Sequence, residues 1–442
     1  MSTTEDYCEK SELQHQFKIP CQNQIESSCF IEYMTRSALS DAANQPLEFQ
    51  IPADSSAFID PSEIYLKVVA KMKTATGDIE QTVQGTCDNI YAPINLALSS
   101  CFDNCDFIVG RTNINLEQGN FALVNHFKTL VSASPLVKDT RLLLAGYTGH
   151  EAGLISTTSK AGHDKRAKMF DLSRPVELMA RLETDLTGTS QLLPSQLGIM
   201  IRLTRASATY SCMAIGAGAG KQACHIEIQE ASLLVRRVTL SPQAQLTKIA
   251  ELNNAPFHYQ FNRLVTRTYQ IPQSQTAAVF ENIFNTKLPS HLFFVMIDAG
   301  AYHGDYTLNP HHYQHFNLKK ASVRVENQIF PSVDEDLDFT GYGRVNTYYH
   351  HLMEALGFDA GQMQTGNGMT RDDLVKNSNF VLGFNLTADG VPIGANTSAN
   401  QDTGLLRLSL EFGTPLSKAV TLVVFGVFPS ELKIDRNRDV WF

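Results

Sequence analysis

The stretch from Cys224 to Pro242, CHIEIQEASLLVRRVTLSP, constrains the fold of this chain more than any other. Apolar and polar residues alternate along it with the period of two that a half-buried β-strand requires. The alternation predicts an apolar face of Ile226, Ile228, Leu234, Val238 and Leu240, with Glu227, Gln229, Arg237 and Thr239 on the other face. A strand with one apolar face must pack against a second layer, which indicates a β-sandwich.

Strand-like segments recur on both sides of this stretch. Before it they are Glu63–Met72 and Leu197–Leu203, and after it they are His291–Gly300, Ala321–Phe330, Leu405–Gly413 and Val420–Phe428. Each half also contains one segment with helical spacing, Gln118–Ser134 in the first half and Gly343–Gly357 in the second. The repeated pattern predicts an all-β protein with two tandem eight-stranded antiparallel sandwiches and short helices in the loops.

In the second predicted helix, a spacing of 100° per residue places Val345, Tyr349, Leu352 and Leu356 on the buried stripe. His350 and Glu354 then fall on the opposite, solvent-facing side.

These patterns divide the chain into four parts. Residues 1–44 are predicted to be an N-terminal arm, 45–241 the first sandwich, 242–254 a linker, and 255–442 the second sandwich with a C-terminal tail. The first forty or so residues are polar and lack sustained apolar periodicity. Such a segment buries too little surface to offset its ordering entropy, so we expect it to gain structure only by docking on a neighbouring molecule.

Composition and charge narrow the class of protein. Among 442 residues, 43% are hydrophobic and 18% are charged, which excludes a disordered chain and a charge-rich helical one. The formal net charge of −9 argues against sequence-specific nucleic-acid binding, which usually needs a concentrated basic face. We interpret the basic cluster Lys160–Lys168, next to the Gly, Ser and Thr-rich segment Gly146–Gly162, as an exposed loop with a solvated tip.

The sequence shows no targeting signal. Its start, MSTTEDYCEK, is polar and acidic, whereas a secretory signal begins with basic residues before an apolar core. The longest apolar run, Ala419–Phe428, is far shorter than the roughly 20 residues needed to span a bilayer. We therefore expect synthesis in the cytosol, no membrane span and reduced cysteines. The spacing of Cys101 and Cys105 is compatible with one helix face, and we expect both to pack in the interior rather than to bind a metal.

The pattern closest to a catalytic motif is His303-Gly304-Asp305, because His-x-Asp and a distant third His bind iron in jelly-roll oxygenases. The later histidines do not supply that third ligand, since some follow too closely and the others lie on the predicted helix; they are His311, His312, His315, His350 and His351. We expect the segment from His303 to His315 to form turns and to pack.

Other motifs fail on spacing. The Asp334, Asp336 and Asp338 series mimics a calcium loop, but Phe339 stands where that loop needs glycine. GAGAGKQ (Gly216–Gln222) lacks the spacing and the hydroxyl of a nucleotide-binding loop and is expected to be a loop tip between strands. The sequence therefore predicts no catalytic, cofactor-binding or metal-binding residues, and we expect that the chain is not an enzyme.

The order of several segments resembles the major capsid protein of Polinton (Maverick) elements and the related adintoviruses, which are double jelly-rolls. The segments that carry the resemblance are PVELMARLETDL (Pro175–Leu186), LLPSQLGIMIRLTRA (Leu192–Ala206), Cys224–Pro242, LVTRTYQIP (Leu264–Pro272), NPHHYQHFNL (Asn309–Leu318) and LKIDRNRDV (Leu432–Val440). The resemblance thus covers roughly Pro175 to the C-terminus.

That resemblance implies a structural protein of the virion. Its members form homotrimers that act as pseudo-hexameric capsomers and tile an icosahedral shell, with neighbouring capsomers and a penton or minor capsid protein as partners. Synthesis in the host cytoplasm is implied, and the place of assembly, cytoplasm or nucleus, stays open. Two other functions remain open from the residues: a minor capsid or receptor- or glycan-binding protein, and a jelly-roll metal oxygenase that uses His303 and Asp305.

The end of the chain supplies the candidate site residues. Arg436, Arg438, Trp441 and Phe442 belong to residue types that are enriched at interface anchors, and Trp441 is the only tryptophan. We predict that these four residues form an assembly interface between adjacent capsomers or with a minor protein.

Overall fold

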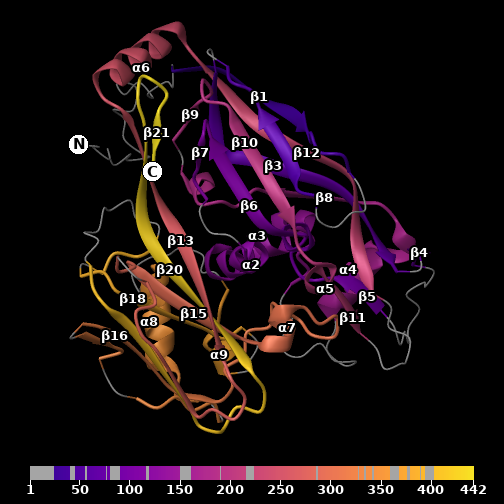
Figure 1. Cartoon of the computed structure of the whole chain (residues 1–442), viewed down its shortest axis with the longest axis vertical. Coiled ribbons are helices and arrows are strands. Elements are labelled where there is room, and N and C mark those ends of the chain that lie inside the picture. Colours follow the sequence, from indigo (N-terminus) through magenta and orange to yellow (C-terminus); the bar gives the residue numbers. More distant parts are fainter. Residues whose placement is uncertain are drawn as a thin grey trace, which may run out of the picture.

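The computed structural model describes residues 24–39, 45–54, 57–75, 77–79, 90–115, 119–149, 161–189, 191–215, 223–284, 287–326, 328–332, 335–340, 343–358, 368–375, 379–388, 390–393 and 403–442. Within these residues the chain forms two β-sandwich lobes, one after the other along the sequence (Figure 1). The first lobe lies toward one end of the long axis and the second toward the other.

The first lobe contains two main antiparallel sheets. One has the order β1-β12-β3, with β8, β9 and the short β4 also paired to β3; its strands are β1 (Ile25–Met34), β12 (Cys224–Leu240), β3 (Ala57–Thr74), β4 (Gly77–Asp78), β8 (Val176–Arg181) and β9 (Leu193–Pro194). The other has the order β2-β10-β6-β7, from β2 (Leu47–Ile51), β10 (Ile199–Arg205), β6 (Phe102–Val109) and β7 (Thr112–Asn113). A small sheet pairs β5 (Ile90–Pro93) with β11 (Cys212–Ile215).

The second lobe repeats this construction. Its first sheet has the order β13-β20-β15-β18, extended by β21, from β13 (Phe257–Ile271), β20 (Val420–Ile434), β15 (His291–Asp298), β18 (Val381–Asn385) and β21 (Val440–Trp441). Its second sheet has the order β14-β19-β16-β17, from β14 (Ala277–Phe280), β19 (Leu406–Phe412), β16 (Leu318–Val325) and β17 (Gln328–Phe330).

The two lobes have the same topology. When the eight main strands of each lobe are numbered along the chain, leaving out β4, β5, β9, β11 and β21, both lobes pair strands 1-8-3-6 in one sheet and 2-7-4-5 in the other. Eight antiparallel strands in two such sheets are a jelly-roll. The predicted fold class, two tandem jelly-rolls, is therefore confirmed.

Helices lie in the loops, as expected. The two predicted helices are confirmed as α2 (Phe121–Ser132) and α8 (Asn346–Leu356). The others are α1 (Ala97–Ser100), α3 (Pro135–Asp139), α4 (Ala161–Met169), α5 (Ala208–Ser211), α6 (Pro242–Asn254), α7 (Ala299–His303), α9 (Arg371–Val375) and the 3₁₀ helices η2 (Arg141–Ala145), η3 (Asp171–Ser173) and η4 (Leu186–Gly188). Residues 242–254, predicted as the linker, are α6, and Ser241 caps its N-terminus through the amide of Ala244.

The buried stripe of α8 differs from the prediction at one residue. Leu352 and Leu356 are buried, and His350 and Glu354 are exposed, as predicted. Tyr348, however, is buried in place of the half-buried Tyr349. The hydroxyl of Tyr348 donates a hydrogen bond to the carbonyl oxygen of Ala321 at 3.1 Å, which satisfies its polar end inside the core.

The predicted faces of β12 are wrong between its two β-bulges and at Arg237, whereas Val238 and Leu240 are buried as predicted. Leu233 and Val235 are buried while Leu234 is not, and Arg237 is only 7% exposed. The pairing of β12 with β3 shifts register between Ile228 and Glu230 and again between Val235 and Arg237. Each β-bulge adds one residue and moves the following side chains to the opposite face, which a strict period of two cannot reveal.

The predicted N-terminal arm is wrong for Ile25–Met34, which form the ten-residue strand β1. This strand pairs with β12 from Ile25 opposite Leu240 to Met34 opposite Ser232. It has the place in the first lobe that β13 has in the second. An edge strand that lies mostly exposed on both faces carries no apolar alternation, so the sequence pattern misses it. Residues 1–23 lie outside the described part of the chain.

The expected solvated tip at Lys160–Lys168 is also wrong. Residues 161–169 form α4, in which Lys165 and Lys168 are exposed but Arg166 is fully buried. The guanidinium of Arg166 donates to the carbonyl oxygen of Pro93 at 2.8 Å and to Oγ1 of Thr148 at 2.7 Å. Of the segment Gly146–Gly162, expected as an exposed loop, Gly146 to Thr148 are buried, and residues 150–160 lie outside the described residues.

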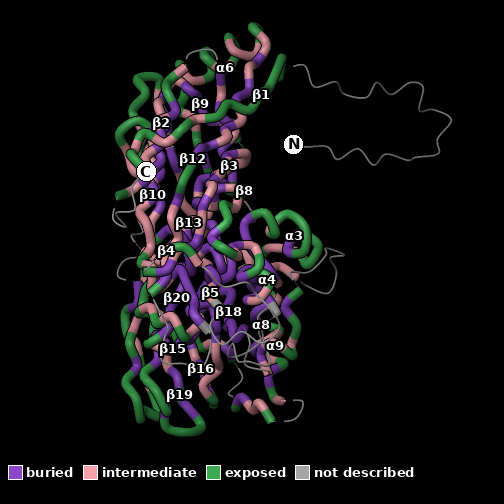
Figure 2. The backbone as a smooth tube through the Cα atoms, turned by 90° about the vertical axis from the view of Figure 1, so that its right-hand side faces the viewer, coloured by how far each residue is buried: buried purple, intermediate pink, exposed green. Residues whose placement is uncertain are grey.

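The long strands β13 and β20 join the two lobes. Each lobe has its own core between its sheets, visible as the buried backbone in Figure 2. One end of the β13–β20 pair reaches into the first core through Tyr259, Phe261, Leu432 and Ile434, whereas the other end belongs to the second core. The lobes are therefore connected by shared strands as well as by α6.

Two further expectations fall where the structure describes little. The predicted loop tip Gly216–Gln222 lies outside the described residues, as does most of the turn-rich segment Asp389–Gly404. Across the described ranges, no helix has both the length and the apolar character needed to cross a membrane.

Candidate functional site

The predicted interface residues at the C-terminus lie in a segment that folds back on the molecule. β21 pairs with the end of β20, with Trp441 opposite Lys433 and Val440 opposite Ile434. The carbonyl oxygen of Val440 accepts a hydrogen bond from Oγ1 of Thr112 in the first lobe at 3.1 Å. The tail is thus part of the folded chain and contacts both lobes.

The ends of these side chains remain accessible. Trp441 is 52% exposed and Phe442 is 39% exposed, and both Arg436 and Arg438 are exposed. The ring of Phe442 stacks on that of Phe261 with centroids 5.9 Å apart. Large aromatic side chains that are ordered but partly exposed to solvent often anchor protein interfaces.

A cavity of about 560 Å³ separates part of the tail from the first lobe. Asn437, Arg438, Asp439, Val440 and Trp441 line one side, and Gly110, Arg111, Thr112, Gln196, Leu197 and Gly198 line the other. The structure therefore brings Arg438 and Trp441 together at one cavity, whose lining does not include Arg436 or Phe442.

A second candidate surface, which sequence reasoning missed, is the outer face of the β1-β12-β3-β8 sheet. Phe30 and Met34 of β1 are 53% and 63% exposed. The ring of Phe30 meets that of Tyr65 on β3, with centroids 6.0 Å apart. The pairing of β1 with β12, which the sequence of β1 does not show, brings Phe30 close to Tyr65 on the strand beyond β12.

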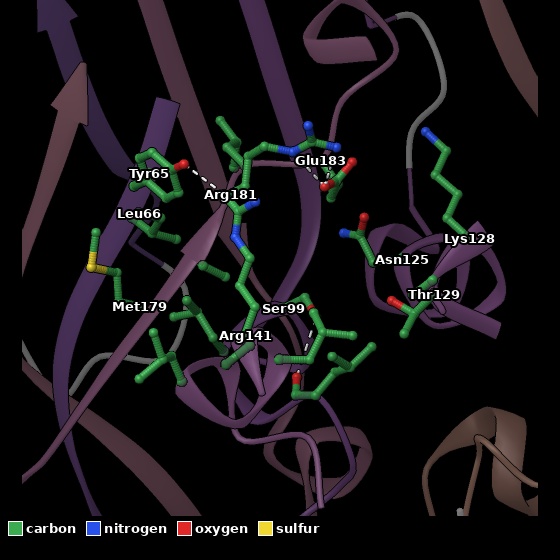
Figure 3. Close-up of a pocket in the computed structure, with 18 of the residues that line it drawn as sticks. Tyr65, Leu66, Ser99, Asn125, Lys128, Thr129, Arg141, Met179, Arg181 and Glu183 are labelled. Atoms are coloured by element: carbon green, nitrogen blue, oxygen red, sulfur yellow. Dashed lines mark hydrogen bonds and ion pairs between the residues drawn. The ribbon is translucent and has the colours of Figure 1, made fainter. Parts of the chain in front are cut away.

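A cavity of about 450 Å³ opens beside this face (Figure 3). Its lining comes from the sheet through Tyr65 and Met179, from η2 through Arg141 and Leu144, and from α2 through Asn125 and other residues. The sheet, η2 and α2 surround it, and both apolar and polar side chains line it, the polar ones including Asn125, Lys128 and Arg181 (Figure 3).

Ion pairs and hydrogen bonds hold several of the polar side chains that line the cavity. Arg181 contacts Glu183 at 2.7 Å, and Nζ of Lys128 contacts Asp185 at 3.1 Å. Arg141 donates to the hydroxyl of Tyr65 and stacks over its ring at 5.4 Å. Burial, together with the carboxylate of Glu63, raises the pKa of Tyr65 above its usual value, so this phenol stays neutral and acts as a hydrogen-bond acceptor for Arg141.

The interface between the lobes is built around α2. Phe127 is 1% exposed and packs against both Phe293 and Phe425 of the second lobe, with ring centroids 5.5 and 4.2 Å away. Leu123, Leu130 and Val131 of the same helix join this cluster. A helix of the first lobe therefore covers the outer face of the β13-β20-β15-β18 sheet of the second lobe.

Buried polar rings continue this interface. His126 of α2 stacks on His311 of the second lobe with centroids 4.1 Å apart, and its Nδ1 lies 2.9 Å from the hydroxyl of Tyr313. Burial, with a smaller effect of the nearby Arg166 guanidinium, lowers the pKa of His311 to about 3. His311 is therefore neutral at physiological pH, which favours its packing against a second imidazole.

The residues of the candidate oxygenase motif have other contacts. Nε2 of His303 lies 3.3 Å from Nε2 of Gln270, and the Asp305 carboxylate accepts from the amide and the hydroxyl of Thr307, both at 2.8 Å. His311 and His312 are buried. The predicted turn-and-packing role of this segment is confirmed. In the described part of the chain, no group of three His, Cys, Asp or Glu side chains is placed to hold a metal.

The remaining candidates from the sequence have structural contacts. Asp336 contacts Lys319 and Lys320, and the Asp338 carboxylate accepts from Thr340 in a turn. Cys101 and Cys105 are buried, as expected, and Cys105 belongs to the strand β6, so the two do not share a helix face.

No protein-family model matches the chain. An uncharacterized protein of Caenorhabditis elegans is 21% identical over 403 residues, which cover 90% of this chain and 93% of that protein.

Among solved structures, a chain of the Sputnik virophage has a TM-score of 0.66 at 10% identity, with 100% of this chain and 93% of that chain covered. The major capsid protein of mavirus has a TM-score of 0.57 at 10% identity and covers 100% and 95%. The Faustovirus major capsid protein has a TM-score of 0.52 at 9% identity and covers 98% and 93%. This chain has the double jelly-roll fold. The similarity extends over its whole length, so both lobes and their mutual arrangement are shared with these structures.

Proposed function

We propose that this chain is the major capsid protein of a Polinton-type DNA virus or element. The observation that carries the proposal is the double jelly-roll itself, in which two lobes of one topology lie side by side in an arrangement shared with the mavirus and Faustovirus major capsid proteins. The Polinton assignment rests on the sequence segments between Pro175 and the C-terminus that resemble that family.

The physical reason concerns symmetry. Two similar lobes in each chain give a homotrimer six similar corners, so a single gene product can fill hexagonal lattice positions by repeating a few contacts. In this proposal the trimers tile an icosahedral shell, contact neighbouring capsomers and a penton or minor capsid protein, and reside in the virion. The chain has a structural role and no catalytic one.

The proposal also sets the domain boundaries. The first jelly-roll begins at β1 rather than at residue 45 and ends near Ser241, α6 connects the lobes, and the second jelly-roll extends from residue 255 to the tail. Strand β1 supports the earlier start because it completes the strand order that both lobes share.

The C-terminal segment supplies a test. We expect the protein expressed alone to form regular shells, and Trp441→Ala or Arg436→Glu to reduce shell yield while trimers persist. Trp441 is half exposed, so its truncation leaves the lobe intact but removes an interface anchor, a loss of about 2 kcal/mol per contact. Negative-stain electron microscopy measures the yield of shells, and sedimentation measures the fraction of protein that remains trimeric.

Leu405→Ala is the matched control, because Leu405 is 66% exposed and lies next to β19, away from the tail. Tail variants that assemble like the wild type would contradict the linking role of the tail. A wild-type protein that never forms shells would favour a minor capsid or receptor-binding protein. Near-stoichiometric iron bound through His303 and Asp305 would favour the oxygenase.

A further inference from the structure

Apolar side chains make up most of the lining of the cavity in Figure 3. Several of these side chains are almost fully buried and belong to the core of the first lobe, namely Leu66, Leu98, Phe102, Phe121 and Leu182. The volume of about 450 Å³ falls within the roughly 300–1,000 Å³ of small-molecule sites, which are mostly apolar with a few well-placed polar groups. The cavity therefore has the size and the lining to hold the hydrocarbon part of a ligand.

One buried polar group at this cavity lacks a hydrogen-bond partner. Asn125 of α2 is only 4% exposed and lines the cavity, but its Oδ1 accepts no hydrogen bond from any residue that the structure describes. Figure 3 shows the amide group of Asn125 pointing from α2 toward Arg181 and Glu183 across the cavity. A buried carbonyl oxygen without a donor destabilises the folded chain, and a hydroxyl group of a ligand would supply the missing donor.

Positive charge predominates at the same cavity. Among the described residues its lining includes three cationic side chains, Lys128, Arg141 and Arg181, and one carboxylate, Glu183. Lys128 and Arg181 are each paired with a carboxylate. Arg141 is exposed and contacts the hydroxyl and the ring of Tyr65, and it forms no ion pair within the described ranges of the chain. Most N–H donors of its guanidinium are therefore available to an anionic group of a ligand.

We propose that this cavity binds a single-chain amphiphile that carries an anionic head group and a hydroxyl group. The hydrocarbon chain lies against the apolar lining, the hydroxyl donates a hydrogen bond to Oδ1 of Asn125, and the anionic group binds the guanidinium of Arg141. Lysophospholipids with a free phosphate have this chemistry. The lining residues all belong to the first lobe of one chain, so the site does not depend on the proposed capsid function.

Three probes with similar hydrocarbon chains test the proposal on the unmodified full chain. Decanoyl lysophosphatidic acid has both the phosphate and the hydroxyl, decyl phosphate lacks the hydroxyl, and monodecanoylglycerol lacks the phosphate. Isothermal titration calorimetry, with each probe below its micelle-forming concentration, measures the dissociation constants. We expect lysophosphatidic acid to occupy one site per chain and to bind roughly tenfold or more tightly than either of the other probes, the effect of one added polar contact.

Two substitutions locate the bound probe. Arg141→Gln should abolish the preference for lysophosphatidic acid over monodecanoylglycerol, and Asn125→Leu its preference over decyl phosphate. Asn125→Leu removes the unpartnered amide, so its unfolding free energy, measured by circular dichroism, should not fall. Arg174→Gln is the matched control, because Arg174 is exposed and does not line the cavity.

Three results would overturn the site: no binding to the wild type, equal dissociation constants for the three probes, or wild-type preferences in both cavity variants. If Asn125→Leu does not fold, the comparison of probes on the wild type and on Arg141→Gln decides the question.

Discussion

Replacing Phe127 with alanine should lower the free energy of unfolding by about 3–5 kcal/mol, the usual cost of removing a fully buried phenylalanine. Phe127 packs against both Phe293 and Phe425, and the site cannot collapse easily because these two residues are paired on adjacent strands of a sheet. The loss falls on the interface between the lobes, so we also expect urea unfolding to change from one transition to two. Circular dichroism and intrinsic fluorescence followed through the same titration would detect the change.

Leu136→Ala is the control for this variant. Leu136 belongs to the neighbouring helix α3 and is 73% exposed, so its truncation should change the unfolding free energy by less than about 0.5 kcal/mol. A Phe127→Ala protein as stable as Leu136→Ala would show that α2 does not hold the lobes together. The proposed pairing of lobes within one chain would then lose its physical basis.

Acidification should destabilise the protein between pH 6.5 and about pH 3 through His311. The folded pKa of His311 is about 3, below its usual 6.5, because the ring is buried at the interface between the lobes next to Arg166. Below pH 6.5 the unfolded chain therefore binds a proton at this ring that the folded chain does not bind. The stabilisation is complete above pH 6.5 and is lost as the pH falls toward 3, by up to about 5 kcal/mol.

The pH dependence can be isolated by substitution. His311→Gln cannot take up the proton, so its unfolding free energy should fall less steeply over this range than that of the wild type. His303→Gln, at an exposed position nearby in the sequence, should keep the wild-type slope. Burial also lowers the pKa of His315, to about 4, and that contribution remains in both variants. Equal slopes for His311→Gln and the wild type would show that His311 is accessible to protons in the folded protein.

The fold class could be predicted from the sequence because several strands bury one face along their whole length. In the segment Leu405–Gly413, predicted as a strand, Leu406, Leu408, Leu410 and Phe412 alternate with polar residues without interruption, and all four are buried in β19. The same reasoning failed in β12 between its two β-bulges, because the first bulge reverses the faces, the second restores them, and a bulge has no signature in the apolar pattern. It also failed for β1, whose side chains are exposed on both faces.

The candidate surfaces were less predictable because they depend on contacts between distant segments. The sequence singled out Trp441 by residue type, and the structure places it half exposed beside a cavity. Nothing near Phe30 in the sequence indicates that it lies against Tyr65, thirty-five residues later, and α2 gave no sign that its two sides contact different lobes. Likewise, the sequence shows Arg166 only as one member of a basic cluster. Its burial depends on hydrogen bonds with Pro93 and Thr148, which are distant in the sequence.

The mass and symmetry of the purified protein test the central claim most directly. Native mass spectrometry combined with cryo-electron microscopy of particles in solution would give both. We predict three times the mass of one chain and a three-fold ring in which the two jelly-rolls alternate as six similar corners. A stable monomer at micromolar concentration, or an assembly without a three-fold axis, would contradict the account.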